Sequence, residues 1–182
     1  DSGRLGTGIL KGPFPMSRTH KTWRVNGAAA VLEVIESTEP TSRRIDIRDF
    51  WPDPACGENI HDGSYCVERD YITTRQLKRL AKLEDYDTAA IVQALKEGPQ
   101  KPARDYKRFR DEAGETVSDS DVFELYYYYG EVEPEVLIAM GVDAGTVPED
   151  AMYLGSVSAI VTMLNGRPIK AAVNPLETGD FP

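Results

Sequence analysis

An Asn-Gly pair late in the chain places the strongest constraint on the fold. Residues 157–164 and 167–173 are rich in Val, Ile, Ala and Leu, and only Asn165-Gly166 separates them. Such a pair between two β-favouring runs is typical of a type I′ turn, because both central residues of that turn need a positive φ. Pro168 removes a backbone donor from the second run, so we expect that strand at a sheet edge. The sequence therefore predicts an antiparallel hairpin here.

A second Asn-Gly pair, Asn26-Gly27, lies between apolar runs at residues 22–25 and 30–35 and predicts another hairpin near the start of the chain. We expect residues 37–43 to form a loop, since they are polar and contain Pro40. Three further segments alternate or are rich in β-favouring side chains. These expected strands are residues 44–50, 64–71 and 122–132.

Two short helices are expected between these strands. The first begins at Thr73 or Thr74, and the second runs from Asp87 to residue 97, where Gly98-Pro99 ends it. Residues 98–120 are poor in apolar side chains and are expected to form a flexible insert, and residues 142–151 a loop. The fold class expected is α+β. We expect a single domain over residues 1–182, with antiparallel strands and hairpins at both ends and two short helices inserted between them.

Charge and hydropathy exclude several classes of protein. The chain has 182 residues, with 30 acidic and 21 Lys or Arg residues, and a formal net charge of -9. This balance argues against a protein that coats nucleic acid, because such binding needs clusters of Lys and Arg. The longest apolar runs, such as residues 28–32, have five residues and are far too short to span a membrane, so no membrane contact is expected. The chain does not begin with Met, and we interpret it as an excerpt of a longer polypeptide.

The densest acidic cluster supplies the only catalytic candidates. Asp46, Asp49 and Asp53 are the residues that would bind a divalent cation or hydrolyse a substrate. A regular strand would place Asp46 and Asp49 on opposite faces, and Asp53 between two prolines is better suited to accept backbone N–H groups in a turn. We therefore expect no enzyme, no metal and no cofactor. A metal-dependent hydrolase or nuclease stays open as the alternative.

Large aromatic side chains are the candidates for core or interface positions. Tyr126, Tyr127, Tyr128 and Tyr129 are consecutive, and a strand would place two on each face. No basic residue interleaves them, so sheet packing is favoured over a base-stacking platform. Trp23 and Trp51 join them as candidates, because large aromatics anchor interfaces.

Several segments, taken in order, resemble the portal (head–tail connector) proteins of tailed bacteriophages, particularly the short-tailed phages. Each segment alone is weakly specific, whereas their order and spacing match over nearly the whole chain. The long insert near 98–120 departs from the pattern. The segments that carry the resemblance are residues 5–11, 45–54, 62–69 with 73–80, 122–132 and 161–182.

The resemblance implies a structural role. Portal proteins form a ring, usually a dodecamer, at one capsid vertex, and double-stranded DNA enters and leaves through its channel. This chain would be a portal wing-like region that binds copies of itself, with terminase, capsid and tail or adaptor proteins as further partners. It would lie in the virion, and in the host cytoplasm during assembly. A generic virion adaptor domain is a further alternative.

Overall fold

The computed structural model describes residues 8–26, 29–100, 122–176 and 181. By its internal contacts the chain divides into two compact units, one ending at Ile47 and the other spanning Arg48–Phe181. We call the first the ribbon and the second the body, and describe each by itself. Most of the expected insert, from residue 101 onward, lies outside the described residues.

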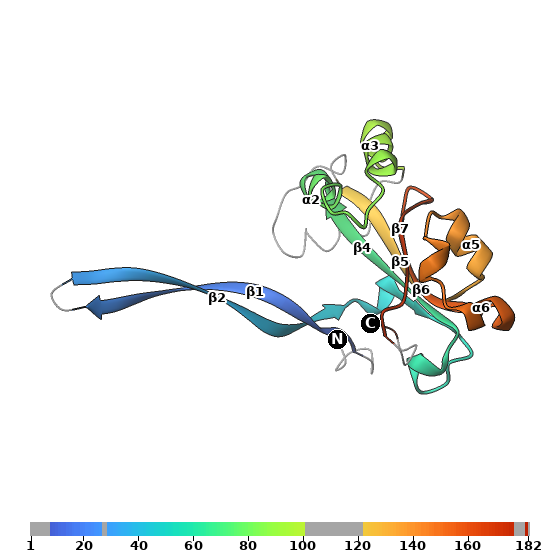
Figure 1. Ribbon diagram of the computed structural model, residues 1–182, viewed down its shortest axis with the longest axis horizontal. Coiled ribbons are helices and arrows are strands. Elements are labelled where there is room, and N and C mark those ends of the chain that lie inside the picture. The colour runs from blue at the N-terminus through green and yellow to red at the C-terminus, as the bar shows by residue number, and fades with distance from the viewer. Residues whose placement is uncertain (1–7, 27–28, 101–121, 177–180, 182) are drawn as a thin grey trace. The chain divides into compact units, whose positions relative to one another are not determined.

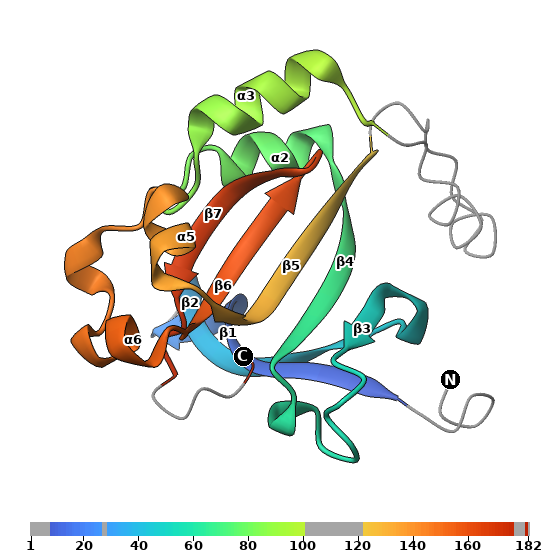
Figure 2. The same cartoon turned by 90° about the vertical axis from the view of Figure 1, so that its right-hand side faces the viewer.

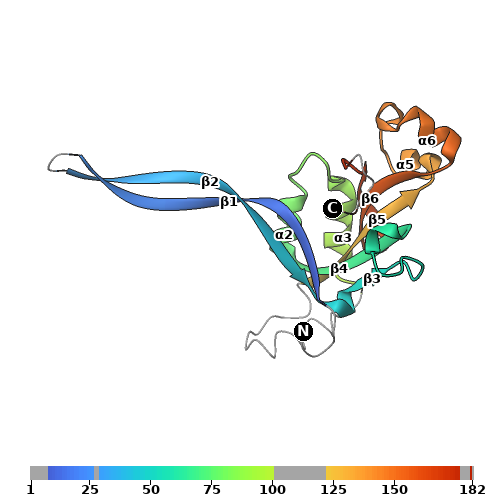
Figure 3. The same cartoon turned by 90° about the horizontal axis from the view of Figure 1, so that it is seen from below.

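The ribbon is one long antiparallel hairpin. Strands β1 (Ile9–Asn26) and β2 (Ala29–Ile45) pair from Ile9 opposite Ile45 to Asn26 opposite Ala29. Strands of this length extend roughly 55 Å, and Figures 1 and 3 show the twist of the pair. The hairpin expected around Asn26-Gly27 is confirmed, and its strands are much longer than the apolar runs that predicted it.

The loop expected over residues 37–43 is wrong, because these residues belong to β2. Pro40 lies opposite Pro15 of β1. Each strand of a two-stranded ribbon has one unpaired edge. A proline whose nitrogen faces that edge removes no hydrogen bond from the ladder, because no neighbouring strand lies there. Pro40 therefore does not end the strand.

The body contains a five-stranded antiparallel sheet (Figure 2). Its strands, in spatial order, are β3 (Phe50–Pro52), β4 (Tyr65–Thr73), β5 (Val122–Val132), β6 (Val157–Leu164) and β7 (Arg167–Val173). Helices and antiparallel strands together give the α+β class that the sequence predicted. The C-terminal hairpin is confirmed, with φ of 50° at Asn165 and 75° at Gly166, and β7 is an edge strand as Pro168 required.

The prediction of one continuous strand over residues 44–50 is wrong in its middle. β2 ends at Ile45, a 3-10 turn occupies Ile47–Asp49, and β3 then begins at Phe50. Asp49 is buried within this turn and bonds to Arg69 on β4. A tertiary partner has thus overridden the local alternation of apolar residues.

Two pairs of helices cover opposite faces of the sheet (Figures 1 and 2). Helices α2 (Thr74–Leu80) and α3 (Thr88–Glu97) pack on one face, with Thr73 forming a capping box and Asp87 accepting two backbone N–H groups. Helices α5 (Pro134–Ala139) and α6 (Glu149–Leu154) pack on the other. Short 3-10 turns occur at Ile60–Asp62 and Ala144–Thr146.

The prediction of a loop over residues 142–151 is wrong at its end, because helix α6 begins at Glu149. It has only 6 residues, and its N-cap, Pro148, makes no side-chain hydrogen bond. Neither periodicity nor capping chemistry marks so short a helix in a sequence.

The sheet separates two hydrophobic clusters. Alternate residues of β5 and β6 point to opposite faces, so each strand contributes to both clusters. The cluster under α2 and α3 consists of Ile72, Leu77, Ile91, Ala94, Phe123, Leu125, Leu164 and Ile169. The cluster under α5 and α6 consists of Leu137, Val147, Ala151, Val157, Ala159 and Val161.

Candidate functional site

Asp53 holds a turn together. Its two carboxylate oxygens accept the backbone N–H groups of Ala55 at 2.8 Å and Ser64 at 2.9 Å. These hydrogen bonds stabilise the charged form and lower the pKa of Asp53 below its ordinary value of 3.8. The turn interpretation of this residue is confirmed. Its oxygens are directed at the chain's own backbone across the loop between β3 and β4.

Asp49 is a partner of Arg69. Arg69 donates from Nε at 2.8 Å and from Nη2 at 2.6 Å to the same oxygen, Oδ1, of Asp49. The side chains are 14% and 10% exposed. Burial disfavours the charged guanidinium, but the hydrogen bond to Asp49 and the nearby charges outweigh it, so the pKa of Arg69 is raised. Because breaking such a pair leaves a buried charge, the arrangement ties the Ile47–Asp49 turn to β4.

Trp51 covers this ion pair. The Arg69 guanidinium lies 5.4 Å from the centre of the Trp51 ring and 5.3 Å from that of Tyr71. The carboxylate oxygen Oε1 of Glu124 lies 3.9 Å from Nη1 of Arg69. The Trp51 residue is 42% exposed, so one side of it faces outward. Cation–π geometry of this kind favours a fixed structural cluster on the sheet surface.

The third acidic candidate, Asp46, is half-buried and lies in the ribbon unit. Among the residues that the structure describes, no group of three or more His, Cys, Asp or Glu side chains is placed to hold a metal ion. Asp49 and Asp53 are directed to different partners, one to Arg69 and the other to backbone N–H groups.

The four tyrosines divide between the two faces of the sheet, as strand alternation predicted. Tyr127 packs against the α2–α3 cluster, and Tyr128 against the α5–α6 cluster. Tyr129 is buried and the other three are half-buried. The Tyr126 hydroxyl donates to Glu124 at 2.8 Å, and burial together with this bond raises the pKa of Tyr126. Burial and the charge of Glu131 likewise raise the pKa of Tyr128. These tyrosines pack within the body.

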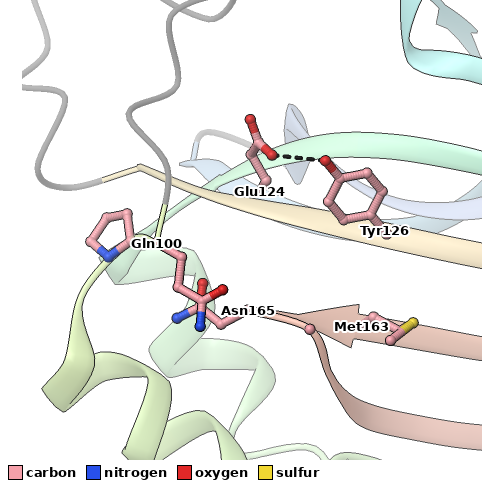
Figure 4. Close-up of a pocket in the computed structure, with 7 residues that line it drawn as sticks. Gln100, Glu124, Tyr126, Met163 and Asn165 are labelled. Carbon is pink, nitrogen blue, oxygen red and sulfur yellow. Dashed lines mark hydrogen bonds between the residues drawn. The ribbon is translucent and has the colours of Figure 1, made fainter.

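A small hollow of about 250 Å³ lies at one end of β5 and β6 (Figure 4). Glu124, Tyr126, Met163 and Asn165 line it together with Pro99, Gln100 and Gly166. Three of its polar side chains bond to neighbours, since Tyr126 donates to Glu124 and Asn165 donates to the backbone oxygen of Gly98 at 3.0 Å. Its volume is smaller than the usual range for small-molecule sites.

The ribbon exposes several large apolar side chains near its turn. Trp23 is 68% exposed and lies directly opposite Leu32, which is 45% exposed. Val31, Val34 and Ile35 are exposed as well. Such residues normally lie in a core or at an interface. The ribbon side chains are therefore the strongest candidates for a binding surface in the described part of the chain.

A second apolar surface covers helices α5 and α6. Met152 is 55%, Leu154 75% and Tyr153 92% exposed. Beside them lies an open hollow of about 280 Å³ lined by Glu133, Pro134, Glu135, Met152 and Gly155. The sequence signal for this surface is the run of apolar residues 152–154, which directly follows the loop expected over residues 142–151.

Comparisons with known proteins leave the fold and these surfaces as the basis for a functional proposal. No protein-family model matches the chain, and no curated protein matches it. Among the helices that the structure describes, none has the length and apolar character needed to cross a membrane.

Proposed function

We propose that this chain is a structural part of a bacteriophage portal ring, through which double-stranded DNA is packaged and ejected. The ordered segments that resemble portal proteins support this proposal. The segment 62–69 with 73–80 overlaps β4 and α2 of the body, and the segment 122–132 coincides with β5. Copies of the same chain are the first partners, and terminase, capsid and tail proteins are the others. The activity proposed is mechanical, with no catalytic role for this chain.

The observation that carries the proposal is the exposed ribbon. A two-stranded hairpin is marginally stable at best when nothing packs against it. This ribbon has 18 residues in one strand and 17 in the other. It exposes Trp23, Leu32 and Val34 instead of covering them. Assembly with copies of the same chain would bury these side chains. In a closed ring, every subunit makes such contacts with its two neighbours.

The charge of the body is consistent with DNA passing without tight binding. Residues 48–182 carry 25 acidic and 14 Lys or Arg residues. An acidic surface repels the phosphate backbone, so DNA would move past it freely. The metal-dependent hydrolase and the generic virion adaptor are the competing functions.

The test is the assembly state of the full-length protein that contains this chain. Its mass in solution is measured by light scattering, and the same sample is imaged in negative stain. Closed rings of about a dozen subunits around a channel as wide as a DNA duplex are expected. A monomer or dimer without rings would count against a portal and in favour of an adaptor. Mg²⁺-dependent cleavage of DNA that is lost in Asp49→Asn while the circular dichroism of the variant stays unchanged would favour the nuclease.

A further inference from the structure

Helix α2 carries a row of basic side chains on the side that faces away from its buried contact. Each helical residue is rotated by about 100° from the one before it, so Arg75 lies about 160° round the helix from Leu77, which is 0% exposed. Lys78 and Arg79 lie within about 60° of Arg75. Lys82 follows in the turn that continues the helix, where its N–H donates to the backbone oxygen of Arg79. All four basic residues are exposed, and together we call them the α2 stripe.

The charges of the α2 stripe are not neutralised within the described part of the chain. No Asp or Glu occurs from residue 71 to residue 83. Arg69, Arg167 and Lys170 each pair with a carboxylate of the body. Among the described residues, by contrast, no side chain of the stripe forms an ion pair or a hydrogen bond. Within that part of the chain, the stripe therefore keeps its charges available to another molecule.

The α2 stripe costs helix stability. Arg75 and Arg79 are four positions apart, and like charges at this spacing repel one another. Lys78 and Lys82 repeat the same spacing. The helix dipole favours Lys78 and Arg79 in the last turn, but it disfavours a cation such as Arg75 in the first. An anion bound across the stripe removes this repulsion, whereas nothing in the packing of α2 around Leu77 requires it.

The composition of the α2 stripe fits the phosphates of a double helix. Protein interfaces are anchored by aromatic and apolar side chains and are depleted in Lys. Single-stranded nucleic acids stack their bases on aromatic rings. The stripe consists of Lys and Arg alone, and contacts with a duplex backbone need only such cations. From its first to its last residue the stripe extends about 10 Å, a length over which a duplex carries about six phosphates.

We propose that the α2 stripe binds the phosphate backbone of double-stranded DNA without reading its sequence. Its cations displace the counterions condensed on the phosphates, and this release supplies the affinity. The body as a whole has an acidic excess that repels DNA, so the contact is confined to the stripe and the DNA is not held tightly. The choice of DNA as the duplex rests on the proposed function. The inference goes further, since it names the residues that touch the DNA.

The salt dependence of DNA binding by the whole chain tests the contact. Binding to a fluorescent duplex of about 20 base pairs is measured by anisotropy over a series of salt concentrations. Contacts with four phosphates predict that affinity falls by about 150-fold between about 50 and 200 mM salt. Two duplexes of unrelated sequence are expected to bind equally well. A salt dependence near zero, or no binding at about 20 mM salt and about 1 mM chain, would overturn the proposal.

A pair of double variants separates the α2 stripe from overall charge. Lys78→Gln with Arg79→Gln is expected to weaken binding by at least about 30-fold at about 50 mM salt and to make it less salt-dependent. The control, Lys21→Gln with Arg24→Gln, removes the same charge from exposed residues of the ribbon and is expected to bind as the unchanged chain does. The melting temperature of the stripe variant is expected to stay unchanged or to rise, because repulsion along α2 is removed. Equal losses of binding in the two variants would overturn the proposal.

Competition with polyglutamate distinguishes a duplex from an acidic protein segment. The charges of extended polyglutamate are about twice as far apart as those along a duplex, so it condenses and releases fewer counterions. Polyglutamate is expected to displace the labelled duplex only at a charge concentration at least about 10-fold above that of unlabelled duplex. Displacement at equal charge concentration would assign the stripe to an acidic protein and overturn the proposal.

The outcomes also separate this contact from the portal proposal. Closed rings of the full-length protein, together with a chain that binds no duplex, would retain the portal function and refute the α2 stripe as a DNA contact. A full-length protein that forms no rings, together with a chain whose DNA binding is lost in the stripe variant alone, would support the contact and refute the portal ring.

Discussion

Arg69 on β4 donates two hydrogen bonds to a single oxygen of Asp49, at 2.8 and 2.6 Å, across 20 positions of sequence. This pair fixes the turn that leads into β3 against the neighbouring strand. It also uses a carboxylate that the sequence offered as a possible metal ligand. Replacing Asp49 with Ala leaves the guanidinium mostly buried without its main acceptor.

We expect Asp49→Ala to lower the free energy of unfolding by about 2–4 kcal/mol, somewhat less than a fully buried pair would lose. Urea unfolding followed by circular dichroism measures the change. The matched control is Asp85→Ala, since Asp85 pairs with Lys170 at 3.1 Å but its side chain is 74% exposed. The control is expected to lose no more than about 0.5 kcal/mol. Equal losses in the two variants would contradict a structural role for Asp49.

Asp53 makes stability depend on pH in a defined direction. Its pKa in the folded protein lies below the ordinary value of 3.8 because Ala55 and Ser64 donate to it. The stability it contributes is therefore present above that value and is lost as pH falls through the lower, folded pKa. We expect Asp53→Asn to be less stable than the unchanged chain at neutral pH. The difference should shrink below about pH 4, and urea unfolding at a series of pH values measures it. A gap that stays constant down to pH 2 would refute this assignment.

Gly130 has no room for a side chain. Its φ is +155°, and an added Cβ would lie 2.5 Å from the backbone oxygen of Ser64 and 2.7 Å from the Cα of Tyr65. We expect Gly130→Ala to cost about 2–4 kcal/mol of unfolding free energy, since backbone atoms cannot move aside cheaply. Gly141→Ala is the control, because Gly141 has φ +98° but nothing within 4 Å. Its expected cost is about 1–2 kcal/mol, the backbone strain alone.

Leu77 tests the packing of α2 on the sheet. It is 0% exposed within the cluster under α2 and α3, whereas Leu83, a few residues later, is 52% exposed. Leu77→Ala is expected to lose about 2–5 kcal/mol, because it removes buried methyl groups and leaves a cavity. Leu83→Ala is expected to change stability by no more than about 0.5 kcal/mol. Thermal unfolding of both variants makes the comparison, and similar melting temperatures would refute this packing.

Trp23 separates association from folding. Because it is 68% exposed, its loss removes little packing within one chain. We expect Trp23→Ser to change the unfolding free energy of the body by less than about 0.5 kcal/mol in dilute solution. The same variant is expected to abolish concentration-dependent stabilisation, since binding adds to apparent stability by mass action. A large loss at high dilution would show that Trp23 acts within its own chain.

Sequence reasoning succeeded where short-range chemistry decides the outcome. The Asn165-Gly166 turn, the strand Val122–Val132 and the helix starts at Asp87 and at Thr73 or Thr74 were all predicted from neighbouring residues, and the structure has the cap at Thr73. It failed for the ribbon beyond its apolar runs. Residues 37–43 are polar and include Pro40, yet pairing with β1 holds them extended. Hydrophobic alternation is a signal of a face packed on a core, and an exposed ribbon lacks one.

The candidate site residues were located by sequence, but their roles were decided by the fold. The candidates were chosen as residue types, carboxylates for metals and large aromatics for interfaces. Only the structure shows that Trp23 is exposed whereas Tyr129 is buried. Only the structure shows that Asp49 pairs with Arg69. The surface around Met152 was missed, because the sequence does not show which side of so short a helix is left uncovered.

The sequence by itself determined the α+β class, the C-terminal hairpin and the net negative charge. Turn and cap preferences act over a few bonds, and charge is a sum over residues, so neither needs a fold to be known. Tertiary structure alone decided which side chains are covered. Burial depends on partners far away in the chain, and one strand's neighbours determine whether an aromatic side chain such as Trp23 or Tyr129 ends in water or in the core.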